Sequence, residues 1–230
     1  MKSTTIASEK TRPFYVKLKR SPMADWFIPE IIKNTKIKKQ KLPKTSLKGE
    51  FQIKRFGYFH KHAWYFFEND DVTGWLPLKS VRNNYRRLAV EPVTSDNHQV
   101  VASYLAVAKM MLNYAGAPVS DTEMNDLFEL SVDEVPLPAD FFTVIVDQIG
   151  SFKNLSGKKL RRLRSHLRRE RPIMMWLGSN NSHPQTAILL TGFNKKVFFY
   201  LDPSTGNVHA ITKKALLKRW KAARHLAISY

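Results

Sequence analysis

The spacing of apolar residues changes partway through the second half of this chain of 230 residues. Between residues 101 and 115, apolar side chains recur every three or four positions, which is typical of a buried helix. The later runs 172–178, 186–193, 197–202 and 225–230 are short and almost continuously apolar, as buried strands are. Helices followed by a sheet predict an α+β order for this half of the chain.

Start and stop signals predict four further helices in the same half. Ser120 and Glu123 form a capping-box sequence, which predicts that a helix follows. The stretch 138–150 has an apolar helical pattern and ends in glycine, a residue typical of helix ends. A leucine stripe surrounded by arginines predicts a helix within 157–171. Thr212 is a favoured residue to begin the last helix, before the final strand.

The first half has a different pattern. Between residues 51 and 81, short aromatic-rich runs alternate with turn signals at the spacing of a small antiparallel β-barrel. The preceding stretch 33–49 is rich in lysine and includes Lys38, Lys39 and Lys41. Lysine often blunts the exposed edge of a sheet, and a lysine-rich surface also binds anions. Both interpretations of this stretch stay open.

Charge limits the classes of partner that suit this chain. It carries 38 Lys and Arg against 19 Asp and Glu, a formal net charge of +19. Residues 1–90 hold 20 basic and 7 acidic side chains, a net +13, and residues 91–230 hold 18 and 12, a net +6. Such a charge is informative about partners rather than fold. Nucleic acid, anionic lipid and an anionic cell-wall polymer are all candidates.

Two features are missing from the sequence. There is no cysteine, which excludes disulfides, thiolate metal sites and thiol nucleophiles. No apolar signal region opens the sequence, and no run of apolar residues is long enough for a membrane span. We therefore expect neither a signal peptide nor a membrane span.

Several motifs follow one another in a particular order after residue 92. A helix ending in NYAG is followed by VSDTEMNDLF, by the strands RPIMMWL and TAILLTGF, and by YLDPSTG. In this order, residues 92–230 resemble the papain-like cysteine peptidases that cut double-glycine leaders from bacteriocin precursors (peptidase family C thirty-nine). The resemblance implies a papain-like fold, in which a central helix packs on an antiparallel sheet.

The resemblance also implies where catalytic residues would stand. The family's cysteine nucleophile begins the central helix, and the corresponding position here is Ser103. The family's histidine and aspartate correspond to Thr186 and Asp202, and the glutamine that helps to bind the oxyanion corresponds to Asn97. A serine hydroxyl is a weak nucleophile without an adjacent base, and threonine cannot act as that base near neutral pH. We predict a peptidase-like domain whose catalytic set is not intact.

Two histidines leave an alternative open. His98 precedes Ser103 by five residues, and His183 precedes Thr186 by three. Either imidazole could act as a general base for the serine hydroxyl. An active peptidase or other hydrolase that uses Ser103 with a displaced histidine is therefore the first alternative function.

A Gly74–Trp75 pair and a paired aromatic strand at Trp64–Tyr65 mark the first half. With these features, residues 13–84 resemble the glycine–tryptophan modules of Gram-positive surface proteins, which are Src-homology-3-like barrels. The resemblance implies attachment to anionic teichoic acid, which the charge of this half suits. Trp75 could face either a ligand or the core.

Two further groups of residues need an interpretation. His60 and His62 have no further ligand at metal spacing, so neither a metal nor a cofactor is expected. The arginines of the helix within 157–171 could bind a polyanion, or could form the solvated face of a packed helix. These arginines are Arg161, Arg162, Arg164, Arg168 and Arg169.

The predicted organisation is a basic tail (1–12), a Src-homology-3-like module (13–84), a linker (85–91) and a papain-like domain (92–230). The predicted function is that of a non-catalytic pseudo-peptidase, which binds an anionic cell-wall polymer such as teichoic acid, or a peptide, at a Gram-positive cell surface. A cytoplasmic nucleic-acid-binding protein is the second alternative, because basic surface interleaved with aromatic residues suits phosphates and bases.

Overall fold

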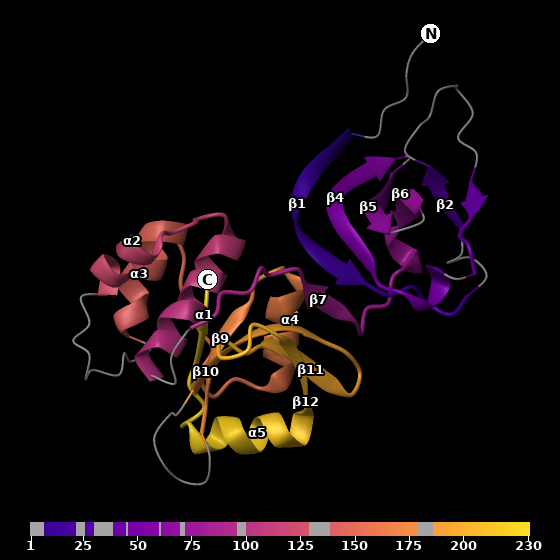
Figure 1. The fold of residues 1–230 in the computed structure, drawn as a ribbon. Coiled ribbons are helices and arrows are strands. Elements are labelled where there is room, and N and C mark those ends of the chain that lie inside the picture. The colour runs from indigo at the N-terminus through magenta and orange to yellow at the C-terminus, as the bar shows by residue number, and fades with distance from the viewer. Residues whose placement is uncertain are drawn as a thin grey trace. The chain divides into compact units, whose positions relative to one another are not determined.

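The chain forms two compact units, unit 1 (Met1–Ala89) and unit 2 (Val90–Tyr230), shown in Figure 1. The boundary between them lies inside the stretch predicted as a linker, 85–91. The structure is a computed structural model that describes residues 7–21, 26–29, 39–44, 46–59, 61–69, 72–95, 100–128, 139–178 and 186–230.

Unit 1 is built from antiparallel strands. They are β1 (Ala7–Val16), β2 (Trp26–Pro29), β3 (Gln40–Lys41), β4 (Phe51–Phe59), β5 (His62–Asn69), β6 (Val72–Pro77) and β7 (Arg86–Leu88), with two 3-10 helices, η2 (Ser46–Lys48) and η3 (Leu78–Ser80). Their order in the sheet is β3-β2-β6-β5-β4-β1-β7. Among the described residues of unit 1, no strand pairing joins β3 to β7, so the path is open there. A closed barrel stays a prediction.

The glycine–tryptophan pair serves the packing of unit 1. Strand β2 runs so close to β6 that a Cβ atom on Gly74 would lie 2.4 Å from the carbonyl oxygen of Ile28. Only glycine fits at such an approach. Trp75 is buried with Ile28, Trp64 and Phe66 in one core cluster. Of the two interpretations of Trp75, the structure therefore supports the core.

Two strands of unit 1 lie partly or wholly outside the module predicted over residues 13–84. Strand β1 begins at Ala7, inside the predicted tail 1–12, and it pairs with β4 from Ala7 onwards. Strand β7 lies inside the predicted linker and pairs with β1. Residues 8–12 are polar and largely exposed, so they lack the apolar alternation that would mark a strand. The register of β1 also shifts between Lys10 and Phe14, where Pro13 interrupts the pattern.

Unit 2 combines helices with a second set of antiparallel strands. The helices are α1 (Val100–Ala115), α2 (Asp121–Phe128), α3 (Asp140–Ile149), α4 (Leu160–Arg168) and α5 (Lys213–Ala222). The strands are β8 (Lys153–Asn154), β9 (Ile173–Leu177), β10 (Thr186–Phe193), β11 (Val197–Leu201), β12 (Val208–Thr212) and β13 (Ala227–Ser229). Their order is β8-β13-β9-β10-β11-β12. The predicted α+β order is confirmed.

The helix boundaries follow the capping signals of the sequence. Ser120 Oγ accepts a hydrogen bond from the Glu123 backbone N–H at 3.2 Å, and Glu123 Oε2 accepts one from the Ser120 N–H at 2.7 Å. This reciprocal pair is a capping box. Gly150 ends α3 in the left-handed conformation, with φ of 79°. Thr212 Oγ1 accepts a hydrogen bond from the Ala215 N–H and so caps α5.

The core of unit 2 lies between α1 and the sheet. Helix α1 packs against β10 and β9, and the ring of Tyr104 meets the indole of Trp176 edge-on, with 5.9 Å between the ring centroids. Phe141 of α3 contacts the same indole, at 5.8 Å. A central helix packed on an antiparallel sheet is the arrangement that the sequence predicted.

Two strands of unit 2 were not predicted. Both residues of β8 are exposed, and only Ile211 of β12 is buried. Neither stretch therefore contains the short apolar run that marks a buried strand. Both strands form through backbone pairing, β8 with β13 and β12 with β11.

Candidate functional site

The peptidase-like positions lie on elements that pack together. Ser103 lies in the first turn of α1 and is 8% exposed. Thr186 begins β10 and is exposed, and Asp202 directly follows β11. The register pairs Leu189 with Leu201, which brings the end of β11 beside the first half of β10. Since α1 packs on β10, unit 2 gathers the elements that carry the three positions.

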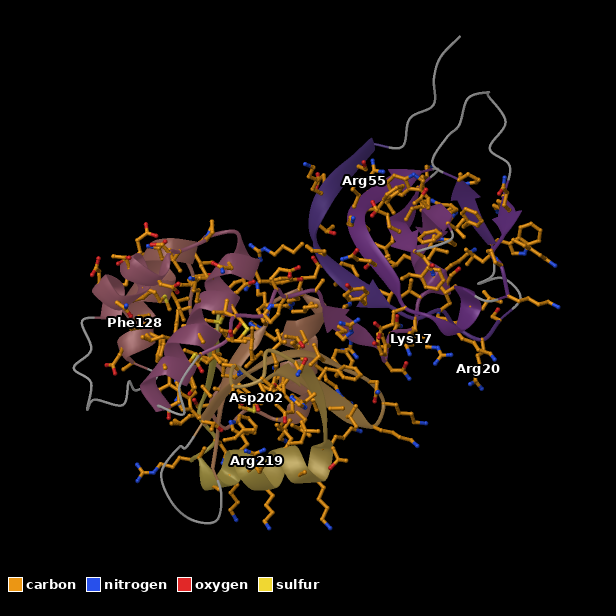
Figure 2. All side chains as sticks on the ribbon, viewed as in Figure 1. Lys17, Arg20, Arg55, Phe128, Asp202 and Arg219 are labelled. Atoms are coloured by element: carbon orange, nitrogen blue, oxygen red, sulfur yellow. The ribbon has the colours of Figure 1, made fainter. Side chains whose placement is uncertain are left out.

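Asp202, labelled in Figure 2, forms hydrogen bonds within the turn that follows it. Its Oδ1 atom accepts hydrogen bonds from the backbone N–H of Ser204 at 3.0 Å and from the Ser204 hydroxyl at 2.6 Å. Its backbone carbonyl accepts a hydrogen bond from the Gly206 N–H at 2.9 Å. These contacts make the Asp202 carboxylate a turn-stabilising group.

The turn also holds the segment that leads into α1. The backbone N–H of Ser95 donates to the carbonyl of Pro203 at 3.0 Å. A Cβ atom on Gly206 would lie 2.8 Å from Cγ2 of Thr94. Glycine at this position therefore lets the segment 92–95 lie directly against the turn.

The groups that could activate Ser103 are only partly described. Asn97, His98 and His183 lie outside the described residues. Tyr104, the neighbour of Ser103, is buried, and burial raises the pKa of its phenol to about 12. A phenol with so high a pKa stays protonated near neutral pH and cannot serve as a base for the serine.

A polar cluster beside Asp202 was missed by the sequence analysis. The rings of Tyr200 and His209 stack with 5.5 Å between their centroids, and His209 Nε2 lies 3.1 Å from the Thr205 hydroxyl. Burial raises the pKa of the Tyr200 phenol, and the negative charge of Asp202 adds to this shift. The positive charge of Arg219 and a hydrogen bond with its side chain oppose it. Cross-strand pairing of β11 with β12 creates this cluster, and no spacing in the sequence signals it.

Unit 1 contains a strongly basic hollow of about 610 Å³, here named the basic pocket. It is lined by Lys17, Leu18, Lys19, Arg20, Ser21, Leu47, Lys48, Gly49 and Arg82. Five of these nine residues are cations, and none is acidic. The neighbouring carboxylate of Glu50 forms an ion pair with Arg87. Among the described lining residues, cations without a carboxylate favour an anion at this hollow.

Strand geometry gathers the cations of the basic pocket. Leu18 and Val81 form an isolated antiparallel bridge, and both side chains are buried. The backbone N–H of Arg82 donates to the carbonyl of Lys17 at 2.8 Å. Because side chains alternate along an extended chain, Lys17, Lys19 and Arg82 point away from the core where the leucine and valine enter it. Figure 2 shows Lys17 and Arg20 on one side of unit 1 and Arg55 on the other.

A second hollow of about 760 Å³ lies in unit 1 and is here named the tryptophan pocket. It is lined by Lys19, Trp26, Phe27, Lys39, His62, Ala63, Trp64, Pro77, Leu78, Lys79 and Asn83. Lys19 lines both pockets. Phe27 and Trp64 are buried, whereas Trp26 and Leu78 are 37% and 40% exposed.

The predicted polyanion-binding lysines have different positions. Lys38 lies outside the described residues, and Lys39 lines the tryptophan pocket. Lys41 pairs with Trp26 across β2 and β3, and its Nζ atom lies 5.5 Å from the centroid of that indole. Lys41 therefore fits the edge-strand interpretation of this stretch, and anion binding stays a prediction.

The arginines of α4 divide into two groups. Arg161, Arg162, Arg168 and Arg169 are exposed. Arg164 is half-buried: its guanidinium lies over the rings of Phe193 and Phe198, and it donates to the Asn194 carbonyl at 3.2 Å. Burial lowers the pKa of Arg164, and Arg168 lowers it further. The position of Arg164 thus suits a packing role, and polyanion binding by these arginines stays a prediction.

The described part of the chain shows neither a metal-binding group nor a membrane-spanning helix. Among those residues, no group of three or more His, Asp or Glu could hold a metal ion. None of the helices found there is long and apolar enough to cross a membrane.

Comparison with known proteins shows a solved structure that part of this chain is similar to. A crystal structure described as a C39-like peptidase from Bacillus anthracis matches 62% of this chain and 94% of its own chain, with 14% sequence identity and a TM-score of 0.52. At this identity the likeness shows the fold alone, which is that of a C39-like peptidase.

The other comparisons add little. A crystal structure described as an autolysin from Listeria monocytogenes matches 94% of this chain and 65% of its own, with 9% identity and a TM-score of 0.29, a score too low to indicate a shared fold. No protein-family model matches the chain, and no curated protein does.

Proposed function

We propose that this protein is a non-catalytic member of the peptidase-like fold that binds an anionic polymer through the basic pocket of unit 1. The single observation that carries the proposal is that the described lining of that pocket holds five cations and no carboxylate. A phosphate-bearing polymer would replace the counterions of these cations, and the released ions would favour binding. Teichoic acid at a Gram-positive cell surface is the proposed ligand, and a Src-homology-3-like module is the proposed form of unit 1.

The peptidase-like domain is proposed to hold a peptide without cutting it. Serine and threonine replace the family's cysteine and histidine, and Asp202 stabilises its own turn. In this proposal, Ser103→Ala leaves the affinity for a peptide unchanged. Labelling of Ser103 by an active-serine probe, abolished by His183→Ala or His98→Ala, would instead establish the alternative of a working hydrolase.

Binding of the full chain to inorganic polyphosphate and to bare polyglycerol phosphate tests the polymer proposal. The variant Lys19→Gln/Arg20→Gln/Lys48→Gln removes three exposed cations from the basic pocket. The matched control, Arg161→Gln/Arg162→Gln/Arg169→Gln, removes the same charge from the exposed face of α4. We expect the pocket variant to weaken binding by about ten-fold or more and the α4 variant by about two-fold or less.

Two outcomes would contradict the proposal. Failure of the unaltered protein to bind either polymer at low salt would exclude an anionic-polymer function. A larger loss in the α4 variant than in the pocket variant would move the binding site to unit 2.

A further inference from the structure

The tryptophan pocket joins two kinds of surface that a bare phosphate chain would not use together. Lys19, Lys39 and Lys79 line it, and no acidic residue is among the described lining residues. The same lining exposes large apolar area on Trp26 and Leu78. A chain of phosphates alone would contact the lysines and leave the indole of Trp26 exposed to solvent. A neutral ligand would leave the lysines without a counter-charge.

The apolar part of this pocket is built on the core of unit 1. Trp64 lines the pocket and is also a member of the core cluster with Trp75. Phe27 lines the pocket and packs edge-on against Phe67, with 5.7 Å between the ring centroids. The inner wall is therefore rigid, and Trp26 and Leu78 extend it to the solvent.

Lys19 connects the tryptophan pocket to the basic pocket, since it lines both. Resting on the proposed binding of an anionic polymer, we infer that the two pockets form one site for a phosphodiester polymer that carries sugar substituents. The phosphates lie in the basic pocket, and the sugar ring enters the tryptophan pocket with its C–H groups against the free edge of the Trp26 indole and the side chain of Leu78. His62 and Asn83 line the same hollow and offer polar groups to the sugar hydroxyls.

A sugar suits this pocket better than a nucleobase does. Stacking of bases requires an open aromatic face. The ammonium of Lys41 lies over the indole of Trp26, 5.5 Å from its centroid, and so occupies part of that face. A sugar can use the remaining edge of the indole and the side chain of Leu78.

The test compares three probes on the full chain: bare polyglycerol phosphate, the same polymer carrying glucosyl groups, and single-stranded oligodeoxythymidine. The variants Trp26→Ala and Leu78→Ser change the tryptophan pocket, and Phe142→Ala, at a 51% exposed phenylalanine of unit 2, is the matched control. The glucosylated polymer should bind about five-fold more tightly than the bare one. Each pocket variant should remove this difference while leaving the affinity for the bare polymer unchanged, and Phe142→Ala should leave it intact.

Equal affinity of the unaltered protein for the two polymers would overturn this inference while leaving the proposed polymer binding in place. If Trp26→Ala weakens binding of the oligonucleotide but not of the glucosylated polymer, the inference is overturned in favour of nucleic acid. Failure to bind any of the three probes would overturn the proposed function as well, so the two failures are distinguishable.

Discussion

The basic pocket of unit 1 and helix α4 of unit 2 both concentrate cations, but they do so with different structural consequences. In the basic pocket, Leu18 enters the core and the neighbouring Lys17 and Lys19 point away from it. On α4, the guanidinium of Arg164 is half-buried, packs over two aromatic rings and bonds to a carbonyl. In the basic pocket, Arg82 likewise donates to the Leu18 carbonyl and Lys17 lies over the ring of Tyr85, whereas Lys19, Arg20 and Lys48 are exposed. The number of basic residues in a segment therefore does not tell how many of them remain available to a ligand.

The largest expected effect is the response of polymer binding to salt. If five cations of the basic pocket contact phosphates, raising the salt concentration from about 50 to 200 mM should weaken binding roughly 100-fold. The triple pocket variant should lower the slope of log affinity against log salt by about two. Calorimetric titration measures this affinity. An affinity that does not change with salt would show that the cations of the basic pocket are no more available to phosphates than Arg164 of α4.

A change of pH tests the buried side of α4. The pKa of His166 is lowered to about 4, chiefly by burial. The positive charges of Arg171, Arg169 and Lys153 lower this pKa as well, and a hydrogen bond to the Tyr230 backbone opposes the shift. The unfolded chain takes up this proton near pH 6.5, so the folded protein should lose stability as pH falls from about 6.5 towards 4.

By pH 4.5 the loss due to His166 should be on the order of 2 kcal/mol. Urea unfolding of the full chain at pH 7 and pH 4.5, followed by hydrogen exchange in α4, measures the effect. The variant His166→Asn is the control, and an equal pH dependence in the variant would argue against His166 as the cause.

A smaller effect separates the arginines of α4 from one another. Arg164→Ala should destabilise unit 2 by about 1–2 kcal/mol, because the protein loses the ring contacts and the hydrogen bond to Asn194. Arg161→Ala, at an exposed position of the same helix, should change the free energy of unfolding by less than about 0.5 kcal/mol. Equal losses in the two variants would contradict the division of these arginines.

Local signals in the sequence were enough for most of unit 2. Three helix-end signals act through neighbouring backbone groups, so each could be recognised from a few residues. They are the capping box that begins at Ser120, the helix-ending Gly150 and the N-cap Thr212. The buried strands β9 and β10 are continuous apolar runs and were equally visible. The edge strands β8 and β12 depend on backbone pairing with a neighbour, which no local pattern records.

The binding hollows could not be predicted in the same way. The basic pocket combines residues 17–21, 47–49 and 82, which the bridge between Leu18 and Val81 helps to bring together. Strand pairing over such sequence separations leaves no periodic signal in any one segment. Lys39 was a candidate for anion binding from the sequence alone, whereas Lys17, Lys19 and Arg82 were overlooked, because the sequence does not show that residues 17–19 and 82 come together.

The contact between the segment 92–95 and the turn after Asp202 has a consequence for anyone who divides the chain. Ser95 bonds to the Pro203 carbonyl, and Thr94 lies against Gly206. A truncated protein that begins at α1 would lack this segment and would leave a hydrogen-bond acceptor of the turn uncovered. Expression of unit 2 by itself therefore calls for a start at or before Val90, so that the turn carrying Asp202 keeps its native support.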